Sequence, residues 1–311
     1  MSSEHLRAQG TLTARAAIAS VAMACALLGL KAYAAWATGS VAMLGSLADT
    51  GFDLLASLIT LYAVRLAAEP ADEKHRFGHG KAEALAALVQ VGLITASALG
   101  ILWRAADRLL HGAPTEAAAL GIGVSLAAIA ATFLLLAYQR RVIARTGSVA
   151  ISADNVHYQS DLLLNLSVIA ALALDQYLGL PGVDALFGIG IALWLIWGGW
   201  RASRQAVNQL MDREWPEEKR QRFVDLANAQ AGFRGIHDLR TRTSGMLDFA
   251  QFHAWVNPRM TIAEAHGFVE AAEQALETAF PGTEVLIHLD PEGHIDRAGE
   301  EDEALRETPE T

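Results

Sequence analysis

Cysteine is almost absent from this chain of 311 residues: Cys25 is the only one, and it lies inside a long apolar stretch. A single cysteine excludes an intrachain disulfide, and at this position we interpret it as a small apolar side chain rather than a metal ligand. The sequence also contains no H-E-x-x-H run, which excludes the familiar signature of a zinc-dependent membrane protease. Positive charge is scarce as well, since 24 Lys and Arg stand against 34 Asp and Glu. Part of the resulting net charge of −10 comes from an acidic C-terminal tail of the kind expected to be disordered and solvated.

Apolar residues make up 52% of the chain, a fraction that a soluble domain can also reach, so their arrangement is more informative than their number. From residue 14 to about residue 210, long apolar stretches alternate with short polar breaks. Six stretches approach or exceed the roughly 20 residues that a helix needs to cross a bilayer. We place the expected spans at 14–38, 41–64, 82–108, 118–139, 148–174 and 182–208. The first span is too long for a cleavable signal peptide.

After residue 210 the composition becomes that of an ordinary soluble protein. The sequence therefore predicts an α-helical membrane protein with six transmembrane helices and a C-terminal α+β domain. The expected parts are an N-terminal segment at 1–13, the transmembrane domain at 14–210, the soluble domain at 211–293 and the acidic tail at 294–311. Within the soluble domain we expect helices near 216–230 and 261–280, and strands near 235–243, 247–256 and 284–290.

Lys and Arg near the ends of the spans predict the orientation, because they concentrate on the cytoplasmic side of a membrane. One side of the expected bundle carries only Arg104 and Arg108. The other side carries Arg7, Arg15, Arg65, Lys74, Arg76, Lys81, Arg140, Arg141, Arg145, Arg201 and Arg204. Both termini and the soluble domain are therefore expected in the cytoplasm.

An internal repeat relates the second and fifth spans. Residues 39–55 read GSVAMLGSLADTGFDLL and residues 147–163 read GSVAISADNVHYQSDLL, so that Asp49 aligns with His157 and Asp53 with Asp161. Three crossings separate the two segments, which gives them opposite directions, as in the inverted repeats around many transport sites. Each aligned pair lies roughly 15–20 Å inside its span, close to the middle of the bilayer.

The four aligned residues have the composition of a metal site. In each helix the pair is spaced i, i+4, so that both side chains lie on one face. Asp49, Asp53, His157 and Asp161 together offer three carboxylates and one imidazole, which suits a tetrahedral Zn²⁺ ion. Each carboxylate costs about 2.5–3.5 kcal/mol at mid-membrane, a cost that favours a functional role over simple hydrogen bonding between helices.

Two further groups of His and Asp lie outside the spans. The loop after the second span contains Asp72, His75 and His79, which are able to bind a metal but are also ordinary residues for a polar loop. In the last expected strand, His288 and Asp290 are two residues apart and share a face. The other histidines of the soluble domain come from separate elements and, taken alone, are equally consistent with surface or core positions: His237, His253 and His266.

These motifs resemble those of the cation diffusion facilitator family, and most closely its bacterial zinc and ferrous-iron efflux branch. The resemblance rests on D-x3-D in the second span, H-x3-D in the fifth, the loop DEKHRFGHGKAE, and HDLR, QFH, EAH and IHLD in the soluble domain. It covers nearly the whole chain apart from the first dozen residues and the tail. It implies a homodimer whose soluble domains have αββαβ topology, and exchange of a divalent cation against protons by alternating access.

The resemblance also assigns roles to residues that the pattern alone leaves open. It implies a second metal site at Asp72, His75 and His79. It implies a pair of zinc ions in the cytoplasmic domain near the dimer contact, held at His237, His253, His266, His288 and Asp290. It further implies a charge interlock between Lys81 and Asp212 where the membrane and soluble domains meet.

We therefore expect a proton-coupled antiporter that exports divalent transition-metal cations from the cytoplasm across the bacterial inner membrane. Zn²⁺ is the expected substrate, with Cd²⁺, Fe²⁺ and Mn²⁺ as alternatives. Zn²⁺ is also the expected structural or regulatory ion, and neither an organic cofactor nor a nucleic-acid partner is expected. His157 is the expected titrating ligand, since imidazole titrates near neutral pH. The alternatives are a membrane-bound metal sensor, which leaves the midplane cluster unexplained, and a metal channel, for which a four-ligand cage releases ions too slowly.

Overall fold

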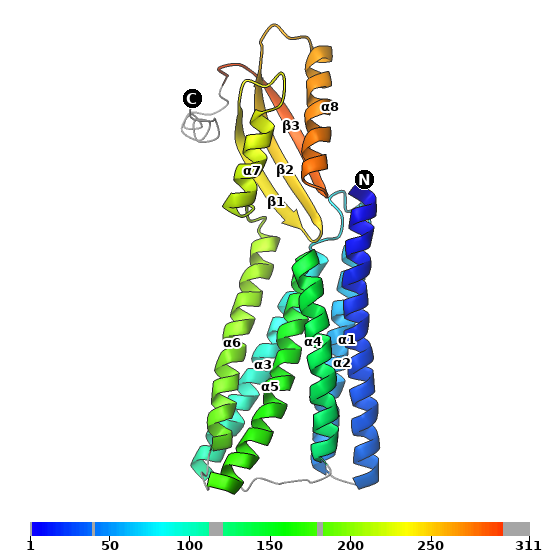
Figure 1. The fold of residues 1–311 in the computed structure, drawn as a ribbon, viewed down its shortest axis with the longest axis vertical. Helices are drawn as coiled ribbons and strands as arrows, with labels where there is room; N and C mark the ends of the chain where they lie inside the picture. Colours follow the sequence, from blue (N-terminus) through cyan, green and yellow to red (C-terminus); the bar gives the residue numbers. More distant parts are fainter. Residues whose placement is uncertain (1, 39–40, 112–120, 179–182, 295–311) are drawn as a thin grey trace. The chain divides into compact units, whose positions relative to one another are not determined.

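The computed structural model describes residues 2–38, 41–111, 121–178 and 183–294 (Figure 1). The predicted acidic tail lies almost wholly outside these ranges. The chain divides into two compact units, one made of residues 9–207 and the other of residues 1–8 together with 208–311. We describe each unit separately.

The larger unit contains six long helices. They are α1 (Ser2–Thr38), α2 (Val41–Ala67), α3 (Ala82–His111), α4 (Gly121–Thr146), α5 (Val149–Leu178) and α6 (Val183–Leu210). Each predicted span falls on one of these helices, and α1 extends the first span almost to the N-terminus.

Within the described residues, four of these helices are long and apolar enough to cross a membrane by length and composition. The qualifying segments are Ala8–Tyr33, Asp49–Ala67, Ala82–Asp107 and Ala185–Leu210, in α1, α2, α3 and α6. The described part of α4 ends in several arginines, and the first half of α5 carries a run of polar side chains, both of which lower the mean hydropathy. Six membrane spans therefore remain a prediction, with four supported by the described helices.

Helix α5 packs against most of the others. Its Ala150 and Ile151 are buried with side chains of α1, α2 and α4. Further along, its Val156 and Leu163 pack on a buried cluster that α3 and α6 share. Many of the buried residues in this unit are alanines, and small side chains allow membrane helices to approach closely. Large apolar side chains point outward instead, as expected for surfaces that face lipid: Trp36, Phe52, Tyr62, Trp103, Phe133, Leu134, Trp197 and Trp200.

The start of α5 is fixed by short-range chemistry. Gly147 ends α4 with a positive φ of 65°, which glycine adopts without steric cost, and its N–H bonds to the carbonyl of Ile143 at 2.8 Å. Ser148 then caps α5, since its Oγ accepts a hydrogen bond from the N–H of Ile151 at 3.3 Å. The Ser148 hydroxyl donates to Oε2 of the buried Glu83 on α3 at 2.6 Å. Glu83 also accepts hydrogen bonds from the first backbone N–H groups of α5 and so joins the two helices at this end.

The smaller unit has the predicted αββαβ order. It consists of α7 (Glu217–Asn228), β1 (Ile236–Ser244), β2 (Leu247–Val256), α8 (Ile262–Ala279) and β3 (Thr283–Pro291). The strands form one sheet in the order β1-β2-β3, with β1 antiparallel and β3 parallel to β2. A capping box starts α8: Oγ1 of Thr261 accepts from the N–H of Glu264, and the Glu264 carboxylate accepts from the N–H of Thr261.

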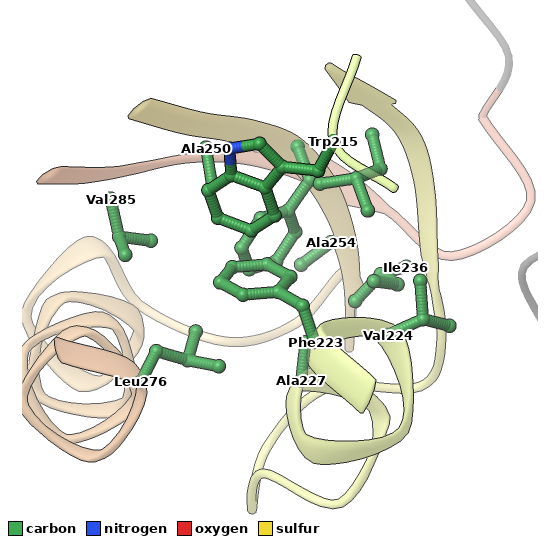
Figure 2. Close-up of a cluster of buried hydrophobic side chains, with 11 residues drawn as sticks. Trp215, Phe223, Val224, Ala227, Ile236, Ala250, Ala254, Leu276 and Val285 are labelled. Carbon is green, nitrogen blue, oxygen red and sulfur yellow. The ribbon is translucent and has the colours of Figure 1, made fainter. Parts of the chain in front are cut away.

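Both helices of this unit pack on one face of the sheet. Figure 2 shows Phe223 of α7 and Leu276 of α8 in one buried cluster with Ala250 and Val285 of the strands, and Val224 of α7 beside Ile236. The rings of Trp215 and Phe223 meet edge to face, with centroids 5.6 Å apart. Since side chains alternate along a strand, the residues between these core positions lie on the opposite face, which is where the histidines are found.

Candidate metal sites

The first group of ligand atoms lies between α2 and α5. Nε2 of His157 is 3.0 Å from Oδ1 of Asp53 and 4.0 Å from Oδ2 of Asp161. His157 is buried, whereas the Asp53 and Asp161 side chains are 22% and 32% exposed. The three residues thus combine a buried imidazole with two partly exposed carboxylates. Three of the four residues that the internal repeat singles out come together here.

Asp49, the fourth residue of the predicted site, is exposed and belongs to no cluster of ligand atoms in the described part of the chain. It lies one helical turn before Asp53 on α2, on the same face. The structure therefore forms three-quarters of the predicted cage, and the participation of Asp49 stays a prediction.

The spacing of the three groups is close to what a tetrahedral ion needs. Ligand atoms about 2.0–2.2 Å from Zn²⁺ lie roughly 3.3–3.6 Å from one another. The two distances from His157 Nε2, 3.0 and 4.0 Å, fall on either side of this range. The ligand atoms of all three residues lie within 4.8 Å of one another, which makes the cluster a candidate metal site.

Hydrogen-bonded side chains surround this cluster on its buried side. The Tyr158 hydroxyl lies 3.0 Å from Oγ of Ser57 on α2 and 3.0 Å from the backbone carbonyl of Ser20 on α1. The Ser20 hydroxyl donates to Oδ2 of Asp154 at 2.6 Å, and Gln139 of α4 donates to the same oxygen at 2.7 Å. Helices α1, α2, α4 and α5 are thus joined by one polar network next to the cluster. The sequence analysis did not identify this network, because only the fold brings these residues together.

The second group lies in the loop between α2 and α3, where the spacing alone had left metal binding open. Nε2 of His79 is 3.1 Å from Nδ1 of His75 and 3.5 Å from Oδ2 of Asp72, and Nδ1 of His75 is 3.4 Å from the same carboxylate oxygen. All three separations are near those of tetrahedral ligands. The donor set of two imidazoles and one carboxylate therefore fits Zn²⁺ with little rearrangement.

The backbone of this loop holds the Asp72 carboxylate ready for an ion. The N–H groups of His75 and Lys74 donate to Oδ1 at 2.6 and 2.8 Å. These hydrogen bonds, above all the one from His75, lower the pKa of Asp72 below its ordinary value. The carboxylate thus stays ionised at pH values where ligand protonation would otherwise compete with a metal.

The third group forms a row across the sheet. In the strand register His237 of β1 pairs with His253 of β2, which pairs with His288 of β3. Asp290, two residues after His288, reaches this row: its Oδ2 is 2.7 Å from Nδ1 of His253 and 3.4 Å from Nε2 of His237, and its Oδ1 is 3.4 Å from Nε2 of His288. Asp290 therefore bridges all three histidines of the row, in a donor set that also fits Zn²⁺.

The fifth predicted residue of the soluble domain lies elsewhere. His266 is on the exposed side of α8 and pairs with Glu270 at 3.4 Å. It therefore belongs to no ligand cluster within one copy of the described chain. Whether it binds a metal stays a prediction, as does the interlock of Lys81 with Asp212.

One nearby carboxylate was missed from the sequence. Asp238 has a positive φ of 49° at an irregularity in the pairing of β1, between His237 and Arg240. Its Oδ2 lies 3.9 Å from Nε2 of His253. An aspartate tolerates this left-handed conformation better than most residues, and a bulge re-aims the side chain that follows it. The only signal in the sequence was its place next to His237 in HDLR.

The comparisons with known proteins match both parts of the chain. Residues 17–211 match the family model of the cation efflux transmembrane domain, and residues 215–292 match that of the cation efflux protein cytoplasmic domain. The cation-efflux pump FieF of Cronobacter sakazakii is 44% identical over 282 residues, which cover 91% of this chain and 94% of the pump. The FieF pump of Klebsiella pneumoniae is 43% identical over 289 residues, covering 93% and 96%.

Among solved structures, the Zn form of CzrB aligns with 28% of this chain and 99% of its own, at 34% identity and a TM-score of 0.26. Family membership rests on the two family models and the FieF pumps alone. Both pumps are named for cation efflux, in agreement with the expectation of a transporter rather than an enzyme. This chain is a membrane protein and belongs to the cation diffusion facilitator family, among the FieF-like cation-efflux transporters.

Proposed function

We propose that this transporter exports divalent transition-metal ions, with Zn²⁺ as the main substrate, in exchange for protons. The observation that carries the proposal is the convergence of Asp53, His157 and Asp161 between α2 and α5, with Asp49 one turn away as the fourth ligand. Two partly buried carboxylates and a buried imidazole suit a borderline ion such as Zn²⁺, and they also admit Cd²⁺, Fe²⁺ or Mn²⁺.

Proton exchange is a consequence of the ligand chemistry. The carboxylates and the imidazole bind a metal only when they are deprotonated, so protons and Zn²⁺ compete for one site. In the proposed cycle, cytoplasmic Zn²⁺ binds the deprotonated ligands, α2 and α5 reorient, and protons from the other side displace the ion. The protonated and neutral carboxyl groups then make the empty return compatible with a low-dielectric surrounding.

The other two groups are proposed as binding and regulatory sites. They lie outside the apolar parts of the helices and so cannot form the path through the membrane. The loop group of Asp72, His75 and His79 and the sheet group of His237, His253 and Asp290 each present three ligand atoms that lie within 4.8 Å of one another. We propose that Zn²⁺ at the sheet group, together with His288 and His266, stabilises a homodimer through its cytoplasmic domains. We also propose that the protein resides in the bacterial inner membrane.

A transport assay with the purified chain separates this function from its alternatives. Proteoliposomes in which the cytoplasmic side of the protein faces outward are loaded with a Zn²⁺ indicator and given an acidic interior. The proposed exchange predicts Zn²⁺ uptake against its gradient, with alkalinisation of the interior. A sensor gives binding without uptake, and a channel gives uptake that only follows the metal gradient. Either result would remove the proposed function.

A further inference from the structure

Tyr158 directly follows the ligand His157 but takes no part in the cluster of ligand atoms. Its side chain is 1% exposed and packs against Leu135 and Leu136 of α4. The ring meets the His157 ring edge to face, with centroids 5.6 Å apart. Tyr158 therefore brings a buried hydroxyl group next to a candidate ligand.

The direction of each hydrogen bond at this hydroxyl follows from its partners. A phenol has one proton, and the Ser20 carbonyl can only accept, so Tyr158 donates to Ser20 at 3.0 Å. Ser57 must then be the donor in the other contact, from its Oγ to the Tyr158 oxygen at 3.0 Å. Ser20 and Ser57 are both fully buried, so water does not compete for these bonds.

The bond from Ser57 fixes α2 against α5 at the cluster itself. Ser57 is four residues after the ligand Asp53, which places both on one face of α2, about 6 Å apart along the axis. Tyr158 is one residue after His157 on α5. The Ser57–Tyr158 and Asp53–His157 contacts are therefore two neighbouring hydrogen bonds between the same two helices.

The bond to Ser20 ties this pair of helices to α1. The Ser20 side chain donates to Asp154, one turn before His157, while its carbonyl accepts from Tyr158. One residue of α1 thus holds α5 on both sides of the ligand His157. The position of α5 along its axis and its rotation are both restrained at this level.

We infer that Tyr158 is a positioning residue that sets the distance between Asp53 and the α5 ligands, and that it thereby favours Zn²⁺ over the larger Cd²⁺. The inference rests on the proposed function, because it needs Asp53 and His157 to be the ligands. A small ion with bonds of about 2.0–2.2 Å requires the two helices to stay close, whereas a larger ion accepts a wider cage. Loss of the Ser57–Tyr158 hydrogen bond lets the ligands on α2 and α5 move apart, which weakens Zn²⁺ binding more than Cd²⁺ binding.

The test compares Tyr158→Phe, Ser57→Ala and the double variant in proteoliposomes, with the KM for Zn²⁺ and for Cd²⁺ as readouts. Tyr62→Phe is the matched control, since it removes a tyrosine hydroxyl from a 70% exposed side chain on α2. Ser57→Ala should raise the KM for Zn²⁺ by about 3- to 10-fold, the effect of one buried hydrogen bond, with a smaller change for Cd²⁺. Tyr158→Phe also loses the bond to Ser20 and should raise the KM for Zn²⁺ at least as much. The double variant should be no worse than Tyr158→Phe alone, because that variant already lacks the contact with Ser57.

Three results would overturn the inference: equal changes in KM for both ions, additive effects in the double variant, or a lower melting temperature with unchanged KM values. Ser57→Ala keeps the test decisive if Tyr158→Phe does not fold. Asp53→Ala, measured alongside, tests the proposed function separately. If it abolishes flux while Tyr158→Phe leaves the Zn²⁺ to Cd²⁺ ratio unchanged, the transport site stands and the positioning role does not.

Discussion

Nε2 of His157 lies 3.0 Å from Oδ1 of Asp53, although 104 residues separate the two along the chain. The contact joins the two halves of the internal repeat at the level of their aligned ligands. It exists because α2 and α5 run beside each other, and it places an imidazole and a carboxylate at nearly the separation that a shared Zn²⁺ ion requires.

Asp49 provides a test of the fourth coordination position. Replacement Asp49→His would make the cage poorer in carboxylate and richer in imidazole, and should shift transport towards Zn²⁺ relative to Cd²⁺ severalfold. Competition between the two ions in a flux assay measures the shift. An unchanged ratio would mean that Asp49 does not bind the ion, in line with its exposed position in this structure.

Glu83 should matter for stability rather than for metal binding. Its carboxylate is buried and accepts hydrogen bonds from Ser148 and from the first turn of α5, so Glu83→Ala leaves several donors without a partner. We expect a loss of about 1–3 kcal/mol and a fall of several degrees in the melting temperature of the protein in detergent. Glu73→Ala, which removes an exposed carboxylate in the preceding loop, is the control and should leave the melting temperature unchanged.

The loop group predicts a specific pH dependence. Hydrogen bonds from the backbone, that of His75 first, lower the pKa of Asp72, so this carboxylate stays charged until the pH falls below its ordinary range near 3.8. Asp72 is therefore not expected to cause a loss of loop-site Zn²⁺ affinity between pH 7 and pH 5. Asp72→Asn should lower the affinity about tenfold and leave the pH midpoint of binding in place.

That measurement needs a background in which the other two groups are disabled, for example with Asp161→Ala and Asp290→Ala. Isothermal titration with Zn²⁺ across the pH range then reports the loop alone. A midpoint that moves with Asp72→Asn would show that the carboxylate itself takes up the proton.

The sheet group should couple Zn²⁺ binding to the stability of the C-terminal domain. A fragment of residues 211–293 keeps the core around Phe223 and Phe252, so it is expected to fold alone. Zn²⁺ at about 100 times its Kd should add about 2.7 kcal/mol and raise the melting temperature. His288→Ala combined with Asp290→Ala should remove most of this gain, whereas Glu277→Ala, which removes an exposed carboxylate from α8, should retain it. If Zn²⁺ does not change the melting temperature of the fragment, the regulatory role proposed for the sheet group is wrong.

Local patterns in the sequence were enough to predict the helices and strands of the soluble domain, whereas most of its candidate metal ligands were assigned by the family resemblance. Period-two alternation gave the strands, and the spacing of His288 and Asp290 placed them on one face. The alignment of His237, His253 and His288 in one row was beyond the pattern, because strand register depends on tertiary pairing. The contribution of Asp238 was hidden too, since it depends on a local irregularity in β1.

In the membrane unit the i, i+4 pairs pointed to the candidate ligands, because carboxylates are costly within apolar spans. The sequence gives no comparable signal for the residues that surround those side chains. Ser20, Ser57 and Tyr158 are ordinary in their own helices, and they acquire a common role only through contacts more than 100 residues apart along the chain. A single sequence cannot show these contacts.

The most direct test of the account is Zn²⁺ flux through Asp161→Ala in proteoliposomes with an imposed pH gradient. Asp107→Ala is the control, since it removes an exposed carboxylate from α3 outside the cluster. The account predicts that Asp161→Ala lowers Zn²⁺ flux by about 100-fold or more, as expected for the loss of a metal ligand. Asp107→Ala should transport Zn²⁺ like the parent protein. Normal Zn²⁺ flux through a folded Asp161→Ala protein would contradict it.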